Sequence, residues 1–273
     1  MPDIRSDRGV AIRGWIIAAD TTSWQSPAAY LYVLRLNGPS LAWEYLRRNA
    51  EYRADWTRRH RENCDPASRW HLEAFEDPAL DARLARPVWR LGQHQRIRLQ
   101  AADSPPDEPE GAHRFSLWDM PGAKRLVHDG RHMLLTGFAD NEMLHLALGQ
   151  DVRDGAPFDF VIGPGAQMEE SWRSVERHRR LAAGERAPVP AVSRRPDRLA
   201  MLHKRALHAF DGRAAGASQR ELARQLFGEE SVTQDWNPDS ELRAQVRHLL
   251  RRARAFVDGG YRDLIAKPAF KGR

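Results

Sequence analysis

The C-terminal third of the chain has apolar residues at helical spacing. The first such segment, residues 195–212, has apolar side chains at positions i, i+3, i+7, i+8 and i+11. These side chains are Leu199, Leu202, Ala206, Leu207 and Phe210. The spacing follows the helical period of about 3.6 residues and predicts an amphipathic helix. The dipeptide Asp211-Gly212 predicts its end.

A second helix is predicted over SQRELARQLFG, residues 218–228. Ser218 and Glu221 have the spacing of a capping box, in which each side chain accepts a backbone N–H of the other residue. The apolar side is formed by Leu222, Leu226 and Phe227. Gly228 supplies the C-terminal stop.

A third, longer helix follows EESVTQDW, residues 229–236, which reads as a connection anchored in the core by Trp236. Asn237 suits the N-cap of this helix and Pro238 its first turn, and Asp258-Gly259-Gly260 ends it. Its apolar residues fall within one arc of about 120° on a helical wheel. They are Leu242, Val246, Leu249, Leu250, Ala253, Phe256 and Val257. Tyr261, Leu264 and Ile265 are expected to fold back on the core.

Arginines line one side of this apolar arc. They are Arg243, Arg247, Arg251 and Arg254, and the same face continues to Ser240 and Ala244. Such a face suits DNA, because guanidinium groups neutralise phosphates, and one guanidinium can donate two hydrogen bonds to O6 and N7 of a guanine in the major groove. It is equally typical of a solvated helix surface. The separation of Gly228 from Asn237 also exceeds the three or four residues of the usual helix-turn-helix turn, so the physical argument leaves both interpretations open.

The remaining chain predicts an α+β fold that is mainly α. Residues 20–75 are predicted to form a helical N-terminal domain, with a helix opened by Ser26-Pro27 and another running from Pro39 to about Cys64. Residues 87–165 contain short apolar runs that predict a small antiparallel β region with a Pro-rich linker at 103–111. The expected strands are in 87–100, 131–138, 143–149 and 158–163, followed by a connecting helix at 166–185 and a helix-turn-helix-like domain at 196–268.

Composition narrows the possible classes. The chain has 273 residues and a net charge of +6, and a sequence pI near 9.9 fits anionic partners. Cys64 is the single cysteine, which excludes an intramolecular disulfide and a zinc site built on two thiolates. Neither a signal peptide nor a membrane span is expected, so a cytoplasmic location is predicted and no membrane partner.

Catalytic motifs are missing from the sequence. It contains no phosphate-cradling glycine loop, no serine-nucleophile elbow and no HExxH. The closest approach to a histidine cluster, residues 128–132, coincides with a predicted hairpin turn, and Cys64 reads as an inert thiol. A nuclease or recombinase would need a carboxylate cluster for Mg²⁺, which is not evident. No enzyme activity, catalytic residue, metal or cofactor is therefore expected.

Two stretches resemble proteobacterial regulators of integrative and conjugative element transfer. The N-terminal resemblance rests on Trp24, Tyr30, Ala42-Trp43-Glu44, Leu46-Arg47-Arg48-Asn49 and Tyr52-Arg53. The C-terminal resemblance, to the helix-turn-helix variant of these regulators, rests on SQRELARQLFG, Asp235-Trp236, Leu242-Arg243, Val246, Leu249-Leu250 and Gly259-Gly260-Tyr261-Arg262. HRFSLWDMPG, residues 113–122, is also similar. Both halves in one chain resemble the FseA-type activators of element excision, which implies promoter binding and transcription activation.

The combined expectation is a sequence-specific DNA-binding transcriptional activator. Its predicted DNA-contacting residues are Ser240, Arg243, Ala244, Arg247, His248, Arg251 and Arg254. The expected partners are double-stranded promoter DNA, RNA polymerase and a small antiactivator protein; the last is implied by the resemblance, since related short proteins carry the C-terminal domain alone and bind the activator. The arginines of the N-terminal domain are expected to contact either DNA phosphates or RNA polymerase. They are Arg47, Arg48, Arg53, Arg58 and Arg59. The alternative is a protein-interaction module, an antiactivator or assembly factor, whose basic helix docks an acidic partner.

Overall fold

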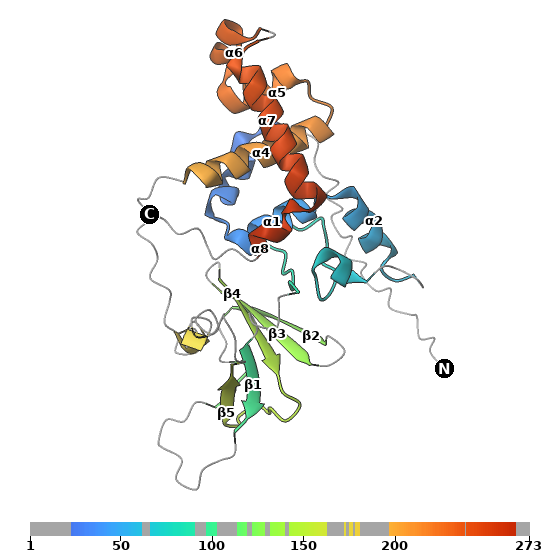
Figure 1. The fold of residues 1–273 in the computed structure, drawn as a ribbon, viewed down its shortest axis with the longest axis vertical. Helices are drawn as coiled ribbons and strands as arrows, with labels where there is room; N and C mark the ends of the chain where they lie inside the picture. Colours follow the sequence, from blue (N-terminus) through green and yellow to red (C-terminus); the bar gives the residue numbers. More distant parts are fainter. Residues whose placement is uncertain are drawn as a thin grey trace, which may run out of the picture.

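A computed structural model gives the structure of most of the chain. It describes residues 23–61, 66–90, 97–102, 114–118, 122–128, 132–139, 142–162, 172, 175–176, 178–180, 197–237 and 239–265. Cys64, the Pro-rich linker at 103–111 and Pro238 lie outside the described residues. The predicted class, α+β and mainly α, is confirmed (Figure 1).

The N-terminal region consists of short helices around an aromatic core. They are η1 (Ser23–Gln25), η2 (Pro27–Arg35), α1 (Gly38–Leu46), α2 (Ala50–Arg58) and η3 (Ala67–Trp70). The single helix predicted from Pro39 was wrong: Asn49 leaves the helical conformation, and its side chain accepts the N–H of Tyr52, so a new helix starts there. Ser26 does precede η2, but its side chain makes no capping hydrogen bond. Trp43, Tyr45 and Tyr52 are fully buried, as expected of a small helical core.

The middle region is a five-stranded sheet with the order β2-β3-β4-β1-β5. The strands are β1 (Ile97–Ala101), β2 (Ala123–His128), β3 (Met133–Ala139), β4 (Glu142–Leu148) and β5 (Phe158–Val161). Strand β2 was not predicted, because its arginine and lysine hide the apolar alternation. The sheet is not purely antiparallel as expected, since β1 and β4 run parallel. The strands β2 and β3 pair as a hairpin, with His128 opposite Met133.

The sheet is tied to the N-terminal region by one arginine of β2. The guanidinium of Arg125 donates to the carbonyl oxygens of Phe75 at 3.0 Å and Arg86 at 2.8 Å. It also forms an ion pair with the carboxylate of Glu76. In the predicted connecting helix, the described residues 172, 175–176 and 178–180 are helical, and Val175 packs on the sheet core.

The C-terminal region contains α4 (Arg198–Ala214), α5 (Gln219–Phe227), α6 (Glu229–Asp235), α7 (Glu241–Ala255), η5 (Phe256–Gly260) and α8 (Arg262–Ile265). Helix α4 does not end at Asp211-Gly212 as predicted but continues to Ala214. Gly212 is buried, and a β-carbon placed there would lie 2.5 Å from Leu222 of α5 and 2.8 Å from the ring of Trp24. The glycine therefore permits a close helix contact and does not mark a helix end.

The two ends of the chain share one hydrophobic core. Leu207 of α4, Val257 of η5, and Tyr261 and Leu264 belong to the same buried cluster as the aromatic residues of α1 and α2. The fold-back predicted for Tyr261 and Leu264 thus takes place onto the N-terminal helices. Figure 1 shows α8 against α1, while α5 and α6 lie at the end of the molecule opposite the sheet. The C-terminal helices are accordingly mounted on the N-terminal region.

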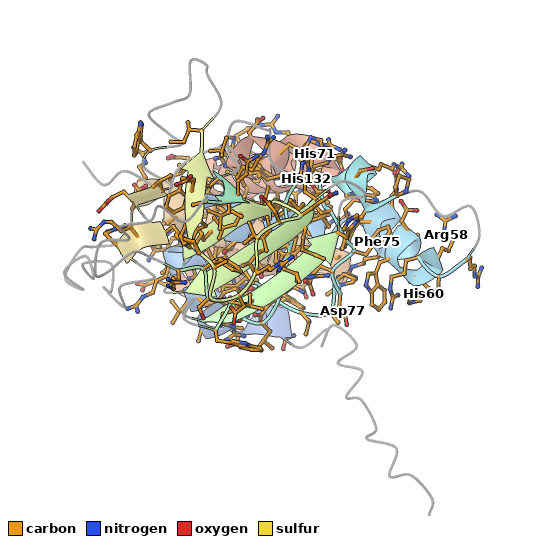
Figure 2. All side chains as sticks on the ribbon, turned by 90° about the horizontal axis from the view of Figure 1, so that it is seen from below. Arg58, His60, His71, Phe75, Asp77 and His132 are labelled. Atoms are coloured by element: carbon orange, nitrogen blue, oxygen red, sulfur yellow. The ribbon has the colours of Figure 1, made fainter. Side chains whose placement is uncertain are left out.

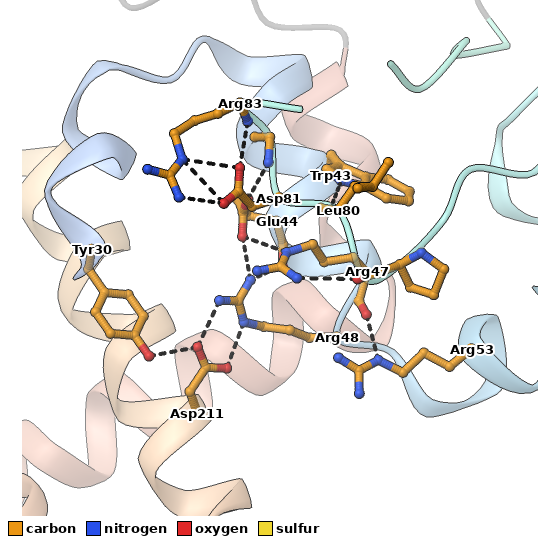
Figure 3. A network of polar contacts seen from close by, with 12 residues as sticks. Tyr30, Trp43, Glu44, Arg47, Arg48, Arg53, Leu80, Asp81, Arg83 and Asp211 are labelled. Atoms are coloured by element: carbon orange, nitrogen blue, oxygen red, sulfur yellow. Dashed lines mark hydrogen bonds and ion pairs between the residues drawn. The ribbon is translucent and has the colours of Figure 1, made fainter. Parts of the chain in front are cut away.

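A buried polar network reinforces this junction (Figure 3). The guanidinium of Arg48, in the turn after α1, donates to both carboxylate oxygens of Asp211 in α4, each at 2.7 Å, and to Glu44 at 2.6 Å. Tyr30 donates its hydroxyl proton to Asp211 at 2.8 Å. Burial alone would raise the pKa of Glu44, but Arg48 and Arg47 lower it to about 2. Both carboxylates are therefore held as anions between cationic partners.

Candidate nucleic-acid interface

Local sequence rules account well for α5. Ser218 accepts the N–H of Glu221 at 3.3 Å, and the Glu221 carboxylate accepts the N–H of Ser218 at 2.7 Å. The predicted capping box is therefore confirmed. Gly228 follows the last turn with a φ of 95°, a backbone conformation that residues with a β-carbon rarely adopt. Leu222 and Ala223 are fully buried, so α5 is fixed against the core by one face.

The start of α7 differs from the prediction. Residues 229–235, expected as a connection, form α6, and α7 begins after Ser240, not after Asn237. The Asn237 side chain accepts the N–H of Asp239 at 3.1 Å and so closes a turn. Ser240 takes the capping role by accepting the N–H of Arg243 at 3.3 Å. Trp236 packs against the core between these turns, as expected.

The apolar face of α7 holds the helix on α4. Leu249 and Ala253 pack against Ala206 and Ala209 of α4, and all four are at most 4% exposed. Val246 joins the core under α5 and is fully buried. The small alanines allow the two helices to approach closely. The orientation of α7 about its own axis is thereby determined.

That orientation turns the predicted basic face outward. Ala244, Arg247, His248, Arg251 and Arg254 are exposed, and Arg243 is half-buried. Within the described part of the chain, Arg247 and Arg251 form neither an ion pair nor a side-chain hydrogen bond. The structure therefore brings together six of the seven predicted site residues on one exposed helix surface.

Two predicted site residues are engaged elsewhere. Ser240 is 8% exposed, because its hydroxyl caps α7. Arg254 is exposed, but its guanidinium pairs with Asp258 at 3.3 Å. Arg247 and Arg251 are consequently the residues best placed to bind an external anion.

Acidic residues surround the beginning of α7. Asp235, Asp239 and Glu241 are all exposed there, and Glu230 is exposed on α6. Carboxylates repel phosphates at short range, so this tip opposes close contact with a DNA backbone. Four of the five arginines of α7, Arg247, Arg251, Arg252 and Arg254, lie in its middle and C-terminal turns. A DNA contact centred there differs from the usual helix-turn-helix geometry, in which the N-terminal residues of the recognition helix reach the bases.

The N-terminal arginines are less available than expected. Arg48 is buried in the network with Asp211, which rules out the surface contact considered for it. Arg47 pairs with Glu44 at 2.8 Å, and Arg58 with Asp55 at 2.7 Å. Figure 2 shows Arg58 and His60 at the outer end of α2. The burial of Arg48 could not be read from the sequence, since arginines are rarely buried without a partner and its partner Asp211 lies 163 positions away.

Neither a metal site nor a membrane-spanning helix is found in the described part of the chain. Among the described residues, no group of three or more His, Cys, Asp or Glu side chains is arranged to hold a metal ion. No helix in the described part of the chain is long and apolar enough to span a membrane.

Comparison with known protein families gives three matches. Residues 161–266 match a model described as "T6SS, Transcription factor, DNA binding domain". Residues 23–92 match a "Proteobacterial transcriptional regulator-like domain", and residues 95–139 match a domain of unknown function. No curated protein matches the chain. The first two matches support a DNA-binding transcription regulator of the proteobacterial type, and α7 lies inside the matched DNA-binding segment.

Proposed function

We propose that the chain is a sequence-specific transcriptional activator that binds duplex DNA through the exposed face of α7. The observation that carries the proposal is the pair Arg247 and Arg251, which are exposed and unpaired within the described residues on a helix fixed by its opposite face. Unpaired guanidinium groups bind phosphates, and one or two of them can read guanine in the major groove. Arg243, Ala244, His248 and Arg254 complete the proposed contact surface, and Ser240 supports it as the helix cap.

The acidic tip formed by α6 and the start of α7 determines which part of α7 can approach DNA. Because the tip repels phosphates, we propose that DNA lies closest to the second and later turns of α7, with Arg243 and Ala244 of the first turn at the edge of the contact. The tip is then left for a protein, and RNA polymerase or an antiactivator is the partner class proposed there. The resemblance to activators of element excision, whose short relatives act as antiactivators, supports the choice of this partner class.

The proposed target is a promoter that controls excision or transfer of an integrative and conjugative element. The description of the matched C-terminal model supplies a second target class, type VI secretion genes. Genome-wide occupancy of the tagged protein distinguishes these two classes, because the bound promoters lie next to different gene sets. Transcript levels at the bound promoters, compared with a deletion strain, then decide between activation and repression.

DNA binding is tested by fluorescence anisotropy with DNA from upstream of the gene and with scrambled DNA, over a series of salt concentrations. The variant Arg243→Ala/Arg247→Ala/Arg251→Ala is expected to bind more weakly and to lower the slope of log K against log salt by roughly 2–3. A matched control, Arg98→Ala/Arg153→Ala with Lys124→Ala, removes the same charge from exposed or half-buried positions of the middle region. Absence of DNA binding by the folded wild type near physiological salt overturns the proposal and favours the protein-docking alternative.

A further inference from the structure

A second cluster of cationic side chains lies where α8 meets the N-terminal region. Residues 71–73 and 88–90 run side by side: Leu72 pairs with Trp89, and the N–H of Arg90 donates to the carbonyl of His71 at 2.6 Å. Leu72 and Trp89 are buried, at 0% and 1% exposed. The neighbouring residues His71 and Arg90, joined by this backbone hydrogen bond, are both exposed.

Arg262 of α8 completes this cluster from the other end of the chain. Its Nε donates to Nδ1 of His71 at 3.2 Å, and its guanidinium donates to the carbonyl of Arg69 at 3.4 Å. Its guanidinium also lies over the ring of Tyr261, at 5.2 Å from the centroid. Tyr261 is fully buried and donates its hydroxyl proton to the carbonyl of Trp70, so α8 is fixed against this part of the N-terminal region.

The cluster lacks the carboxylates that usually accompany neighbouring cations. Within the described residues, neither Arg90 nor Arg262 forms an ion pair, whereas the adjacent Arg69 pairs with Glu51 and Asp55. Like charges held close together repel each other. Burial, Arg262 and Arg90 together lower the pKa of His71. A cationic concentration of this kind is stabilised when an anion binds.

The backbone and tautomer of His71 add a directed donor. The backbone of His71 is fixed as the left-handed C-cap of η3, with a φ of 60°, the one positive φ among the described residues other than glycine. Because Nδ1 accepts from Arg262, the proton of the neutral ring resides on Nε2. The Nε2–H is then a hydrogen-bond donor beside two guanidinium groups. This donor set matches the oxygens of a phosphate.

We propose that Arg90, Arg262 and the Nε2–H of His71 form a phosphate-binding site, and that a DNA backbone phosphate beside α7 occupies it. This proposal rests on the proposed function. Arg262 follows the C-terminal end of α7 in the chain, after a kink at Gly259, where φ is 147°. The site includes residues from both ends of the chain, so DNA binding there depends on the docking of α8 against the N-terminal region.

The test compares wild type, Arg90→Ala/Arg262→Ala and the conservative Arg90→Lys/Arg262→Lys, with Arg98→Ala/Arg153→Ala as a control of equal charge. Binding to upstream and scrambled DNA is measured by anisotropy over a salt series. The alanine variant is expected to lower the salt slope by about 1–2 on both DNAs, because phosphate contacts carry no sequence information. The lysine variant and the control are expected to keep the slope, and thermal unfolding of each variant verifies folding.

A second arm separates DNA phosphates from free ones. The imidazole NMR signals of His71 are followed while inorganic phosphate replaces chloride at constant ionic strength. A shift in wild type that the alanine variant lacks, with an unchanged DNA slope, assigns the site to a free phosphate. The proposal is overturned if neither the DNA slope nor the phosphate response changes in the alanine variant. If the wild type does not bind DNA, the proposed function is overturned. The phosphate titration still decides in that case whether the phosphate site exists.

Discussion

The buried ion pair between Arg48 and Asp211 predicts a large stability effect for a single substitution. In Arg48→Met the guanidinium is lost, while Glu44, fully buried, and Asp211, with a side chain 27% exposed, remain. Removing one partner of a buried pair costs about 3–5 kcal/mol. For Arg48→Met we expect the free energy of unfolding to fall by about 3 kcal/mol, at the lower end of this range, because Asp211 is partly solvated and still accepts the hydroxyl proton of Tyr30.

The pKa of Glu44 gives an independent magnitude. Its fall from 4.5 to about 2 corresponds to about 3 kcal/mol of interaction favouring the anion. Since the folded-state pKa is lowered, this stabilisation is present above pH 4.5 and is lost as the pH falls towards 2. The pKa of Asp211 is also lowered, so its contribution to stability is likewise lost as the pH falls. In Arg48→Met we expect a flatter dependence of stability on pH over this acidic range.

The assay is urea unfolding followed by tryptophan fluorescence. The double-mutant cycle of Arg48→Met with Asp211→Asn is expected to give a coupling free energy of about 1–3 kcal/mol. Arg83→Met serves as the control, since its pair with Asp81 has an arginine side chain 62% exposed and is expected to contribute less than about 1 kcal/mol. A coupling below about 0.5 kcal/mol, or equal effects of Arg48→Met and Arg83→Met, would refute the reasoning.

Two further substitutions test the packing and capping of the C-terminal helices. Gly212→Ala gains about 1 kcal/mol of helix propensity but forces a β-carbon to 2.5 Å from Leu222, so we expect a net loss of about 1–2 kcal/mol in urea unfolding; a stabilised variant contradicts the close contact. Ser218→Ala removes the cap of α5 and is expected to lower the free energy of unfolding by about 1 kcal/mol, with Ser218→Gly losing only a few tenths. Equal losses for these two variants would contradict the capping role.

The sequence was sufficient where a local rule decides the structure. The capping box of Ser218 and Glu221 determines the start of α5, and the periodicity of Val246, Leu249 and Ala253 determines which face of α7 is buried. A local competitor explains the error at Asn237, because Ser240 is an equally good cap. Ser240 was predicted to contact DNA, but its hydroxyl caps α7 by accepting the N–H of Arg243.

Features that depend on distant segments could not be predicted from local pattern. The parallel pairing of β1 and β4 joins strands separated by more than forty residues. Arg48 was treated as a surface residue because its partner Asp211 belongs to the opposite end of the chain. The same holds for His71 and Arg262, which are brought together only when α8 docks. The basic face of α7 was predictable because all its members lie on one helix.

The exposed face of α7 can be tested directly as the DNA-contacting surface by arginine-selective labelling with phenylglyoxal, read by peptide mass spectrometry with and without saturating duplex DNA. We predict that DNA protects Arg247 and Arg251, while Arg98 and Arg153 are labelled equally in both samples. If Arg247 and Arg251 are labelled to the same extent in free and fully DNA-bound protein, α7 is not the DNA-binding helix.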